Sequence, residues 1–220
     1  VRHVNVPFEG FGKLRNTALG LLKHDWVVSI DADERSTPAF AAEVRGILEA
    51  GPKFAAYHVP RHSHFLGKHI RYSGWYPDYR QPQFFNRTKL CYADDLVHEG
   101  YKLDGELGYL SSPIPQYPWN TIEIAVGKMQ RYSTLMARRY QQQGKQAGLA
   151  KLLLNPIFMF FRIYLLKQGW RDGRHGLILA AIYAYYTFLK YSKLWELQKA
   201  AIPQPSAVPA AQPLARPLNA

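Results

Sequence analysis

The residues that indicate the fold read Trp26-Val27-Val28-Ser29-Ile30-Asp31-Ala32-Asp33-Glu34. The stretch begins as a short apolar run rich in β-branched side chains, which predicts a buried strand. It ends in an acidic turn, and Thr37-Pro38 then predicts a helix that begins with an N-cap and an N1 proline and stops near Gly51. Strand, acidic turn and helix in this order are typical of an open α/β sheet, whose ligands bind at the carboxyl ends of the strands.

A second helix is predicted upstream of this strand. The turn Gly10-Phe11-Gly12 leads into apolar residues at helical spacing over 14–22. The first turn of that helix carries Lys13, Arg15 and Asn16. Backbone N–H groups, a helix N-terminus and two cations together favour an anion. The alternative is an ordinary exposed, basic helix start.

The segment 52–119 is richer in aromatic residues, Pro and Gly. We predict short strands at 54–60, 83–85 and 108–114. The stretch between these predicted strands is expected to be loop that faces substrate, and it includes Gly74-Trp75-Tyr76-Pro77-Asp78-Tyr79. Its aromatic rings either stack on a sugar or belong to the core.

The segment 120–199 is predicted to be helical. The three predicted helices run from Asn120, with Glu123 as a capping-box partner, to Gly144; over 156–167, with Asn155 as cap and Pro156 at N1; and over about 176–195. The proline-rich segment 200–220 is predicted to be a disordered tail. The expected organisation is therefore an α/β part at 1–119, a helical region at 120–199 and the tail.

Positive charge is concentrated in the helical region. The chain has a net charge of +12, yet residues 1–127 hold 14 basic and 14 acidic side chains, whereas residues 128–199 hold 13 basic and 2 acidic ones. This distribution excludes a chain-wide basic surface of the nucleic-acid-binding kind. Cys91 is the only cysteine, which excludes an internal disulfide framework and a cysteine-rich zinc module.

Two carboxylates two residues apart at the end of a strand can both turn toward one divalent cation. Asp31 and Asp33 have this spacing, and their oxygen atoms suit Mg²⁺ or Mn²⁺ bridged to substrate phosphates. The alternative is that aspartates are simply common at strand ends. The histidines at 58, 62, 64 and 69 have no cysteine nearby and no H-E-x-x-H helix, and we predict no metal site there.

Further carboxylates are candidates for a general base. Val97-His98-Glu99 lies close to Asp94 and Asp95, and Asp78 lies between Pro77 and Tyr79. A carboxylate or imidazole poised by its neighbours can remove a proton from a hydroxyl group. Each of these segments can also be an ordinary polar loop.

An ordered series of motifs carries a resemblance to a known family. Residues 10–19 and 26–34 resemble the middle of a glycosyltransferase family 2 domain. The series continues with Gly74-Trp75-Tyr76-Pro77-Asp78, Val97-His98-Glu99, Lys128-x-x-Arg131-Tyr132-Ser133 and Gln168-Gly169-Trp170-Arg171-Asp172-Gly173. It is similar to the subgroup that contains the lipopolysaccharide inner-core β-1,4-glucosyltransferases. Two departures are Gln83-Phe84-Phe85 and Gln116-Tyr117-Pro118-Trp119, where relatives often have Arg-Leu-Phe and a His.

The resemblance implies a GT-A fold, a UDP-sugar donor, a divalent cation on Asp31 and Asp33, and inversion at the anomeric carbon. Lys13, Arg15 and Asn16 are then expected on the donor side. Inversion by a single displacement requires a base on the acceptor hydroxyl, for which Glu99 is the first choice and Asp78 the second. The βαβ units that begin this family, with their uracil-binding residues, are expected to be missing from this chain.

The function that follows is an inverting, metal-dependent transfer of a sugar, with glucose expected, from a UDP-sugar to a lipid-anchored envelope glycan, with the lipopolysaccharide core as the expected acceptor. The expected location is cytoplasmic, peripheral on the inner face of the bacterial inner membrane. The alternative function is a membrane-surface binding module without catalysis. No nucleic-acid partner is expected.

The helical region is expected to hold the chain on an anionic membrane surface without crossing it. The apolar run 177–189 is too short for the ~30 Å hydrocarbon core, and the run 152–166 is interrupted by Asn155, Pro156 and Arg162. Tyrosines over 183–191 and Trp195 are expected at the headgroups. The alternative is that these helices pack on the catalytic domain and the charge faces solvent.

Overall fold

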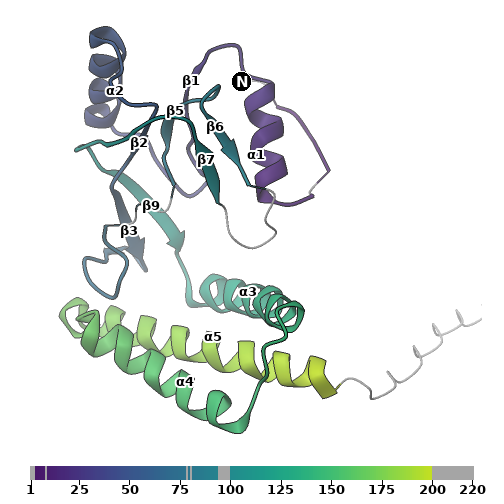
Figure 1. The fold of residues 1–220 in the computed structure, drawn as a ribbon. Helices are drawn as coiled ribbons and strands as arrows, with labels where there is room; N and C mark the ends of the chain where they lie inside the picture. Colours follow the sequence, from purple (N-terminus) through teal and green to yellow (C-terminus); the bar gives the residue numbers. More distant parts are fainter. Residues whose placement is uncertain (1–2, 8, 78, 80, 94–99, 200–220) are drawn as a thin grey trace, which may run out of the picture.

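The computed structural model describes residues 3–7, 9–77, 79, 81–93 and 100–199. An α/β part holds the described elements from α1 to β9, and a layer of three long helices lies against it (Figure 1). The expected mixture of sheet and helix is confirmed. The predicted tail over 200–220 lies outside the described residues.

The two helices that flank the acidic turn form where the sequence predicts them. They are α1 (Phe11–Gly20) and α2 (Pro38–Ala50). The N-cap of α2 is made by Thr37, whose Oγ1 accepts a hydrogen bond from the Phe40 N–H at 3.1 Å. Gly51 ends this helix at a φ of 83°, which a glycine adopts without steric cost. Local side-chain chemistry is therefore sufficient to define α2.

The first sheet has the strand order β1-β5-β2-β8. Its strands are β1 (Trp26–Val28), β5 (Phe84–Asn86), β2 (Ala56–His58) and β8 (Leu107–Tyr109). β2 and β8 are parallel, and the other pairs are antiparallel. Since β1 is an edge strand and the Val28 side chain is exposed, the prediction of a buried strand is wrong. An apolar run does not show how many neighbouring strands or helices will cover it.

Two smaller sheets complete the α/β part. One has the order β4-β3-β9, and the other pairs β6 with β7. The strands are β3 (Arg61–Phe65), β4 (Lys68–His69), β9 (Ile114–Trp119), β6 (Leu90–Tyr92) and β7 (Tyr101–Leu103). Most of the segment predicted as substrate-facing loop before residue 74 is therefore sheet. The sequence of β3 is mostly polar, so it carries no apolar alternation, although its burial alternates.

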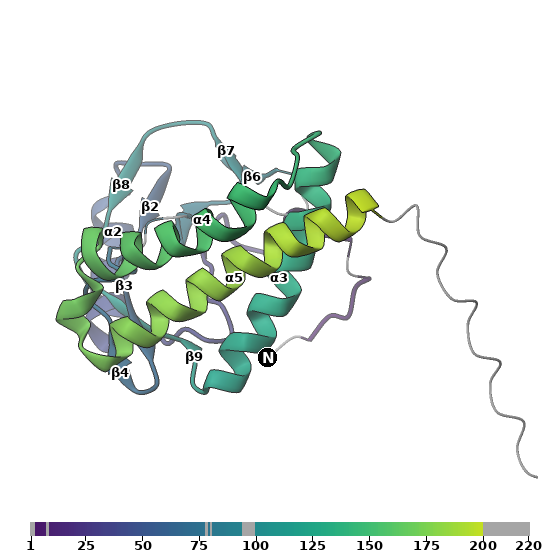
Figure 2. The ribbon, with the colours of Figure 1, turned by 90° about the horizontal axis from the view of Figure 1, so that it is seen from below.

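The helical layer consists of α3 (Ile122–Gln142), α4 (Leu149–Phe161) and α5 (Arg174–Lys199). A π-helical turn, η1 (Arg162–Leu166), extends α4, and α5 contacts both other helices (Figure 2). Two predicted starts are wrong. Thr121, rather than Asn120, caps α3 by accepting a hydrogen bond from a backbone N–H. α4 begins before Pro156 and contains it, because packing along α5 outweighs the one helical hydrogen bond that a proline removes.

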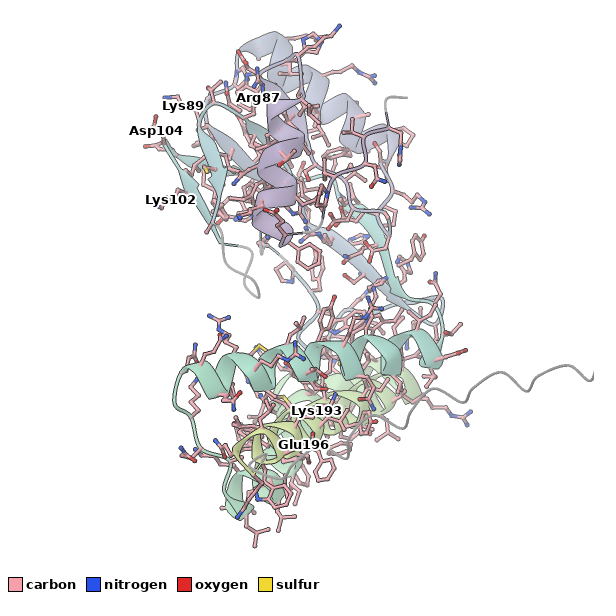
Figure 3. All side chains as sticks on the ribbon, turned by 90° about the vertical axis from the view of Figure 1, so that its right-hand side faces the viewer. Arg87, Lys89, Lys102, Asp104, Lys193 and Glu196 are labelled. Carbon is pink, nitrogen blue, oxygen red and sulfur yellow. The ribbon has the colours of Figure 1, made fainter. Side chains whose placement is uncertain are left out.

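One lysine ties two helices of this layer together. The Lys193 ammonium on α5 donates to the Gln130 carbonyl at 2.8 Å, to Ser133 Oγ at 2.8 Å and to Thr134 Oγ1 at 2.9 Å, all on α3 (Figure 3). Desolvation lowers the pKa of Lys193, since the ammonium exchanges water for these neutral acceptors. Part of the positive charge of the helical region is thus structural.

Asp172 joins the helical layer to the α/β part. It lies in the 3-10 helix η2 (Gly169–Asp172) and is 2% exposed. Its carboxylate accepts hydrogen bonds from the N–H groups of Arg71 and Tyr72, each at 3.2 Å, and from Ser73 Oγ at 2.8 Å. The motif Gln168-Gly169-Trp170-Arg171-Asp172-Gly173 therefore anchors the helices to the chain that follows β4.

The aromatic segment after this anchor is divided between core and surface. Trp75 is buried in a core cluster with Trp119 and Leu179, and its Nε1–H donates to the Tyr183 hydroxyl at 3.0 Å. Tyr76 and Tyr79 are exposed. Of the two interpretations of these rings, core packing holds for Trp75, and Tyr76 and Tyr79 remain candidates for contact with a sugar.

Gly176→Ala is expected to lower the free energy of unfolding by about 3 kcal/mol, because the new methyl group would overlap the Gly169 carbonyl in the turn that carries Asp172. Gly127→Ala on α3 is the matched control, since no atom lies within 4 Å of its new Cβ and alanine favours a helix. Urea unfolding followed by circular dichroism measures both. Equal stability of the two variants would show that the turn tolerates a side chain.

Candidate functional site

The acidic turn is held between the first sheet and β9. It follows β1, and the Tyr117 N–H of β9 donates to the Asp33 carbonyl at 2.8 Å. The Arg35 N–H donates to the Pro115 carbonyl at 3.0 Å, and Glu34 forms an antiparallel bridge with Gln116. Backbone hydrogen bonds on both sides of Asp33 therefore fix the turn against β9, which leads directly into α3.

The buried side chain of Glu34 stabilises this turn through hydrogen bonds. Its side chain is fully buried, and Oε1 accepts a hydrogen bond from Arg61 Nε at 2.6 Å. Oε2 accepts from the Asp31 N–H at 2.9 Å and from Gln83 Nε2 at 2.8 Å. Desolvation raises the pKa of Glu34, and the hydrogen bonds and the charge of Arg61 oppose that rise. The carboxylate thus connects the turn to β3 and to the residue before β5.

Sequence reasoning did not identify this support. In the sequence Glu34 is recognisable only as part of the acidic turn, and Gln83 only as part of a predicted strand and a departure from the family pattern. Arg61 gave no signal, because it lies in a polar stretch that did not resemble a strand. A buried charge needs a buried partner, so a buried Glu34 implies a cation or an amide close to it. Arg61 and Gln83 can be recognised as those partners only when the strand pairing is known.

Arg15 of the predicted anion site forms an ion pair with Asp31 of the acidic turn. Arg15 NH2 donates to Asp31 Oδ1 at 3.1 Å, and NH1 donates to Ser29 Oγ at 3.2 Å. Both side chains are partly exposed. A cation bound by the Asp31 carboxylate would attract an anion. The guanidinium of Arg15 lies beside that carboxylate and can contact the same anion.

The other two residues of the predicted anion site lie differently. Lys13 is exposed and pairs with Glu9, one turn back, at 3.2 Å. Asn16 uses its amide to hold β6, since Nδ2 donates to the Tyr92 carbonyl and Oδ1 accepts from the Tyr92 N–H, each at 2.9 Å. Asn16 therefore has a structural role in joining α1 to β6. Donor binding by Lys13 and Asn16 stays a prediction.

The donor set of the turn suits a hard divalent cation. Asp33 is half-buried, and in the described part of the chain no hydrogen bond reaches its carboxylate. Among those residues no group of three or more His, Cys, Asp or Glu side chains could enclose a metal ion. Two carboxylates without a protein cage match the way Mg²⁺ binds, with substrate phosphates and water in the remaining positions. Asp31 and Asp33 therefore suit such a cation by the chemistry of their oxygen atoms, and cation binding stays a prediction.

The candidate bases are carboxylates outside the described part of the chain. Glu99, with Asp94, Asp95 and His98, lies outside the described residues, and so does Asp78. Their assignment as base remains the sequence-based prediction.

A cluster of three imidazoles lies on β3 and β4. The ring centroids of His62 and His69 are 4.3 Å apart, and those of His64 and His69 are 5.4 Å apart. His64 also stacks on Tyr117, whose N–H holds the acidic turn. Burial, the neighbouring imidazoles and Arg71 lower the pKa of His69 to about 4, and burial lowers that of His62. These three histidines form no group that could hold a metal ion in the described part of the chain.

His69→Gln is expected to flatten the dependence of stability on pH. The His69 pKa is about 4 in the folded chain and about 6.5 when unfolded, so the unfolded chain takes up a proton first as the pH falls below 6.5. The wild type should lose about 1–2 kcal/mol more than the variant between pH 7 and 4.5, allowing for solvent screening. Urea unfolding at both pH values measures this difference. Identical losses would contradict it.

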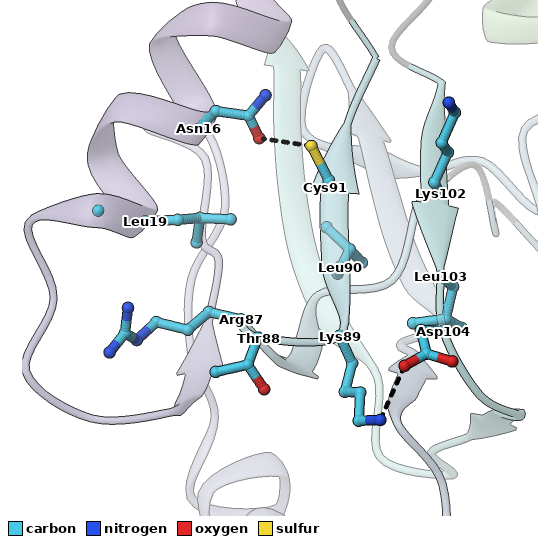
Figure 4. Close-up of a pocket in the computed structure, with 11 residues that line it drawn as sticks. Asn16, Leu19, Arg87, Thr88, Lys89, Leu90, Cys91, Lys102, Leu103 and Asp104 are labelled. Carbon is cyan, nitrogen blue, oxygen red and sulfur yellow. Dashed lines mark hydrogen bonds and ion pairs between the residues drawn. The ribbon is translucent and has the colours of Figure 1, made fainter.

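The surface also has an open hollow of about 630 Å³ between α1, β6 and β7. Among its lining residues are Asn16, Arg87 and Cys91, and Lys89 pairs there with Asp104 at 2.8 Å (Figure 4). Neither Asp31 nor Asp33 lines it. The hollow is therefore separate from the acidic turn.

Comparison with known proteins points to one class of enzyme. No family model matches the chain. The lipopolysaccharide core biosynthesis glycosyltransferase LpsC of Rhizobium meliloti is 27% identical over 202 residues, which is 89% of this chain and 73% of LpsC. Uncharacterized glycosyltransferases of Rickettsia bellii and Rickettsia conorii are 22% and 23% identical, over 87% and 86% of this chain and 68% and 71% of their own lengths. The chain is thus similar to glycosyltransferases over most of its length.

Proposed function

We propose that this chain, whose curated relatives are glycosyltransferases, transfers a sugar from a UDP-sugar to a lipid-anchored glycan with inversion at the anomeric carbon. The observation that carries the proposal is the acidic turn, in which Asp31 lies beside Arg15 and the backbone at Asp33 is fixed against β9. The turn presents two carboxylates and a guanidinium at one partly exposed place. We assign the chain to glycosyltransferase family 2, with a GT-A fold, on the series of motifs in its sequence.

The turn can bind and orient the diphosphate of the donor. Asp31 and Asp33 would hold Mg²⁺ or Mn²⁺, which when bound neutralises the negative charge that develops on the leaving diphosphate. Arg15 would contact a phosphate oxygen directly, since its guanidinium already lies 3.1 Å from Asp31. Glu34 keeps the turn in place while the charge changes, because its own hydrogen bonds are to β3, the residue before β5 and the turn backbone.

Inversion requires one displacement and one base. The acceptor hydroxyl attacks the anomeric carbon, the bond to the diphosphate breaks, and the base takes the hydroxyl proton. Glu99 is the proposed base, and Asp78 is the second candidate. No covalent nucleophile is needed for this course.

The acceptor is proposed from the relatives and from the charge of the helical region. LpsC is named for lipopolysaccharide core biosynthesis, and we propose a lipopolysaccharide-core acceptor, with glucose as the sugar, for this chain. A lipid-anchored acceptor would require the enzyme to work at the inner face of the bacterial inner membrane. The surplus of cations over 128–199 is suited to an anionic surface of that kind.

Glu99→Gln is expected to lower the rate of sugar transfer with little change in donor affinity, because the base acts on the acceptor and the amide keeps the shape of the side chain. Transfer from radiolabelled UDP-glucose to purified core acceptor gives the rate, and calorimetry gives donor affinity. Asp78→Asn is the matched variant. If that variant alone shows this pattern, Asp78 is the base. Donor binding without transfer or hydrolysis by the wild type would instead favour a binding module.

A further inference from the structure

The outer side of α4 and η1 is an apolar surface that no other described element covers. α4 has no buried residue. Eight large apolar side chains of this segment are each at least 50% exposed: Leu149, Leu153, Leu154, Ile157, Phe158, Phe161, Leu165 and Leu166. We call these eight residues the α4 face. Figure 2 views the molecule from this side, with α4 lying along α5.

The spacing of the α4 face is that of a single helix side. Positions 149, 153, 157, 161 and 165 follow one another at four-residue steps, and 154 and 158 lie beside them. The opposite side of α4 packs on α5. A soluble protein rarely leaves a continuous apolar surface of this kind in water, so the α4 face is expected to have a partner.

The charges around the α4 face indicate the chemistry of that partner. Five exposed cations lie in or just after the segment: Lys151, Arg162, Lys167, Arg171 and Arg174. From 148 to 195 the sequence contains one acidic residue, Asp172, and its carboxylate is buried under the turn that follows β4. An apolar helix side with exposed cations near it in the sequence, and no exposed acid among them, complements anionic phospholipid.

The structure changes which helix is the candidate for membrane contact. The sequence predicts headgroup contact for the tyrosines of α5 and for Trp195, and among these Tyr185 and Trp195 are exposed. Yet Tyr183 and Tyr186 pack against the core cluster that contains Trp75, and Lys190 is buried against the rings of Tyr140 and Tyr186. Much of α5 therefore faces the protein.

Among the described helices, one segment is long and apolar enough to cross a membrane, judged by length and composition only. It is Leu149–Leu166, which carries the α4 face. Crossing would also have to accommodate α5, which lies along α4 and carries Lys190 and Lys193. A charged side chain in the hydrocarbon is costly. A position parallel to the surface, with only the α4 face in the acyl region, avoids that cost.

We propose that the α4 face inserts into one leaflet of an anionic bilayer, with α4 parallel to the surface and the five cations at the lipid phosphates. This insertion deepens the proposed function, because the same membrane surface could carry the lipid-anchored acceptor. It rests on that function only for the identity of the membrane. Its evidence is the exposure and charge of the helical layer.

The experiment uses the single cysteine of the chain. In a Cys91→Ser background, Phe158→Cys is labelled with a nitroxide, and its accessibility to oxygen and to a water-soluble nickel chelate is measured by electron paramagnetic resonance. The vesicles contain phosphatidylglycerol and phosphatidylethanolamine, or phosphatidylcholine alone. Glu49→Cys on α2 is the matched label, because it is exposed on the α/β part. None of these readings depends on sugar transfer, so they stand whether or not the enzyme proposal fails.

With anionic vesicles, the label at 158 should become more accessible to oxygen and less accessible to nickel, while the label at 49 should not change. The double variant Ile157→Glu/Phe158→Glu should lower vesicle partition at least tenfold, because both side chains are already in water in the free protein and the fold does not need them. Leu48→Glu, an exposed leucine on α2, should partition like the wild type.

Four results would overturn the inference. The first is a label at 158 that stays accessible to nickel on vesicles that bind the protein. The second is equal partition to phosphatidylcholine alone. The third is a concentration-dependent dimer in sedimentation that shields position 158 without lipid, which would make a second copy the partner. The fourth is a label on Leu149→Cys that lies in the far leaflet while the label at position 158 lies at the bilayer centre. That result would show that α4 crosses the membrane.

Discussion

Asp33→Asn is expected to reduce sugar transfer by about 100-fold or more, with the free energy of unfolding within about 0.5 kcal/mol of wild type. In the described chain the Asp33 side chain makes no hydrogen bond, and its structural contacts are made by the backbone, so the amide should leave the turn intact. The loss comes from removing one of two carboxylates that would hold the divalent cation against the diphosphate.

The measurement is the rate of transfer from a UDP-sugar at saturating Mg²⁺ or Mn²⁺, with urea unfolding as the check on folding. Asp104→Asn is a matched control, because Asp104 is an exposed carboxylate that pairs with Lys89 away from the turn. Full activity of Asp33→Asn, or full activity of the wild type in excess chelator, would contradict the assignment of this turn to a cation.

Glu34→Gln is expected to lower the free energy of unfolding by about 2–4 kcal/mol and to reduce transfer as well. The buried carboxylate accepts three hydrogen bonds, from Arg61 Nε, from Gln83 Nε2 and from the Asp31 N–H. A glutamine has one acceptor oxygen and places an NH₂ group where the other stands. At least one of the three buried donors then faces the new NH₂ group. The Arg61 guanidinium also no longer has the negative charge of Glu34 beside it.

Glu43→Gln is the control for this change. Glu43 also accepts several hydrogen bonds, from the Ser111 N–H and hydroxyl and from the Ser112 N–H, but it lies at the surface of α2. Its replacement should cost about 1 kcal/mol or less, because water can satisfy the donors that it leaves. Equal costs for Glu34→Gln and Glu43→Gln in urea unfolding would mean that burial of Glu34 contributes nothing.

The variants Asp33→Asn and Glu34→Gln separate the catalytic role of the acidic turn from its stability. If Asp33→Asn loses activity with normal stability, and Glu34→Gln loses stability together with activity, then Asp33 acts in the reaction and Glu34 positions the turn. A similar pattern for both would mean that the turn acts as a single structural unit.

Local chemistry is the part that the sequence by itself determined. Thr37 and Pro38 begin α2, and Gly51 ends it, because a cap, an N1 proline and a glycine with positive φ act through neighbouring residues. The position of Asp31 and Asp33 in a turn after a strand follows from the apolar run before them.

The tertiary structure decided everything that depends on how many neighbours a segment has. β1 is an edge strand, Glu34 is buried under Arg61 and Gln83, and α4 begins before Pro156 and leaves its apolar side uncovered. The physical reason is the same in each case. Strand partners, buried ion pairs and helix packing come from residues far apart in the chain, and their energies exceed the local preferences that a sequence pattern reports.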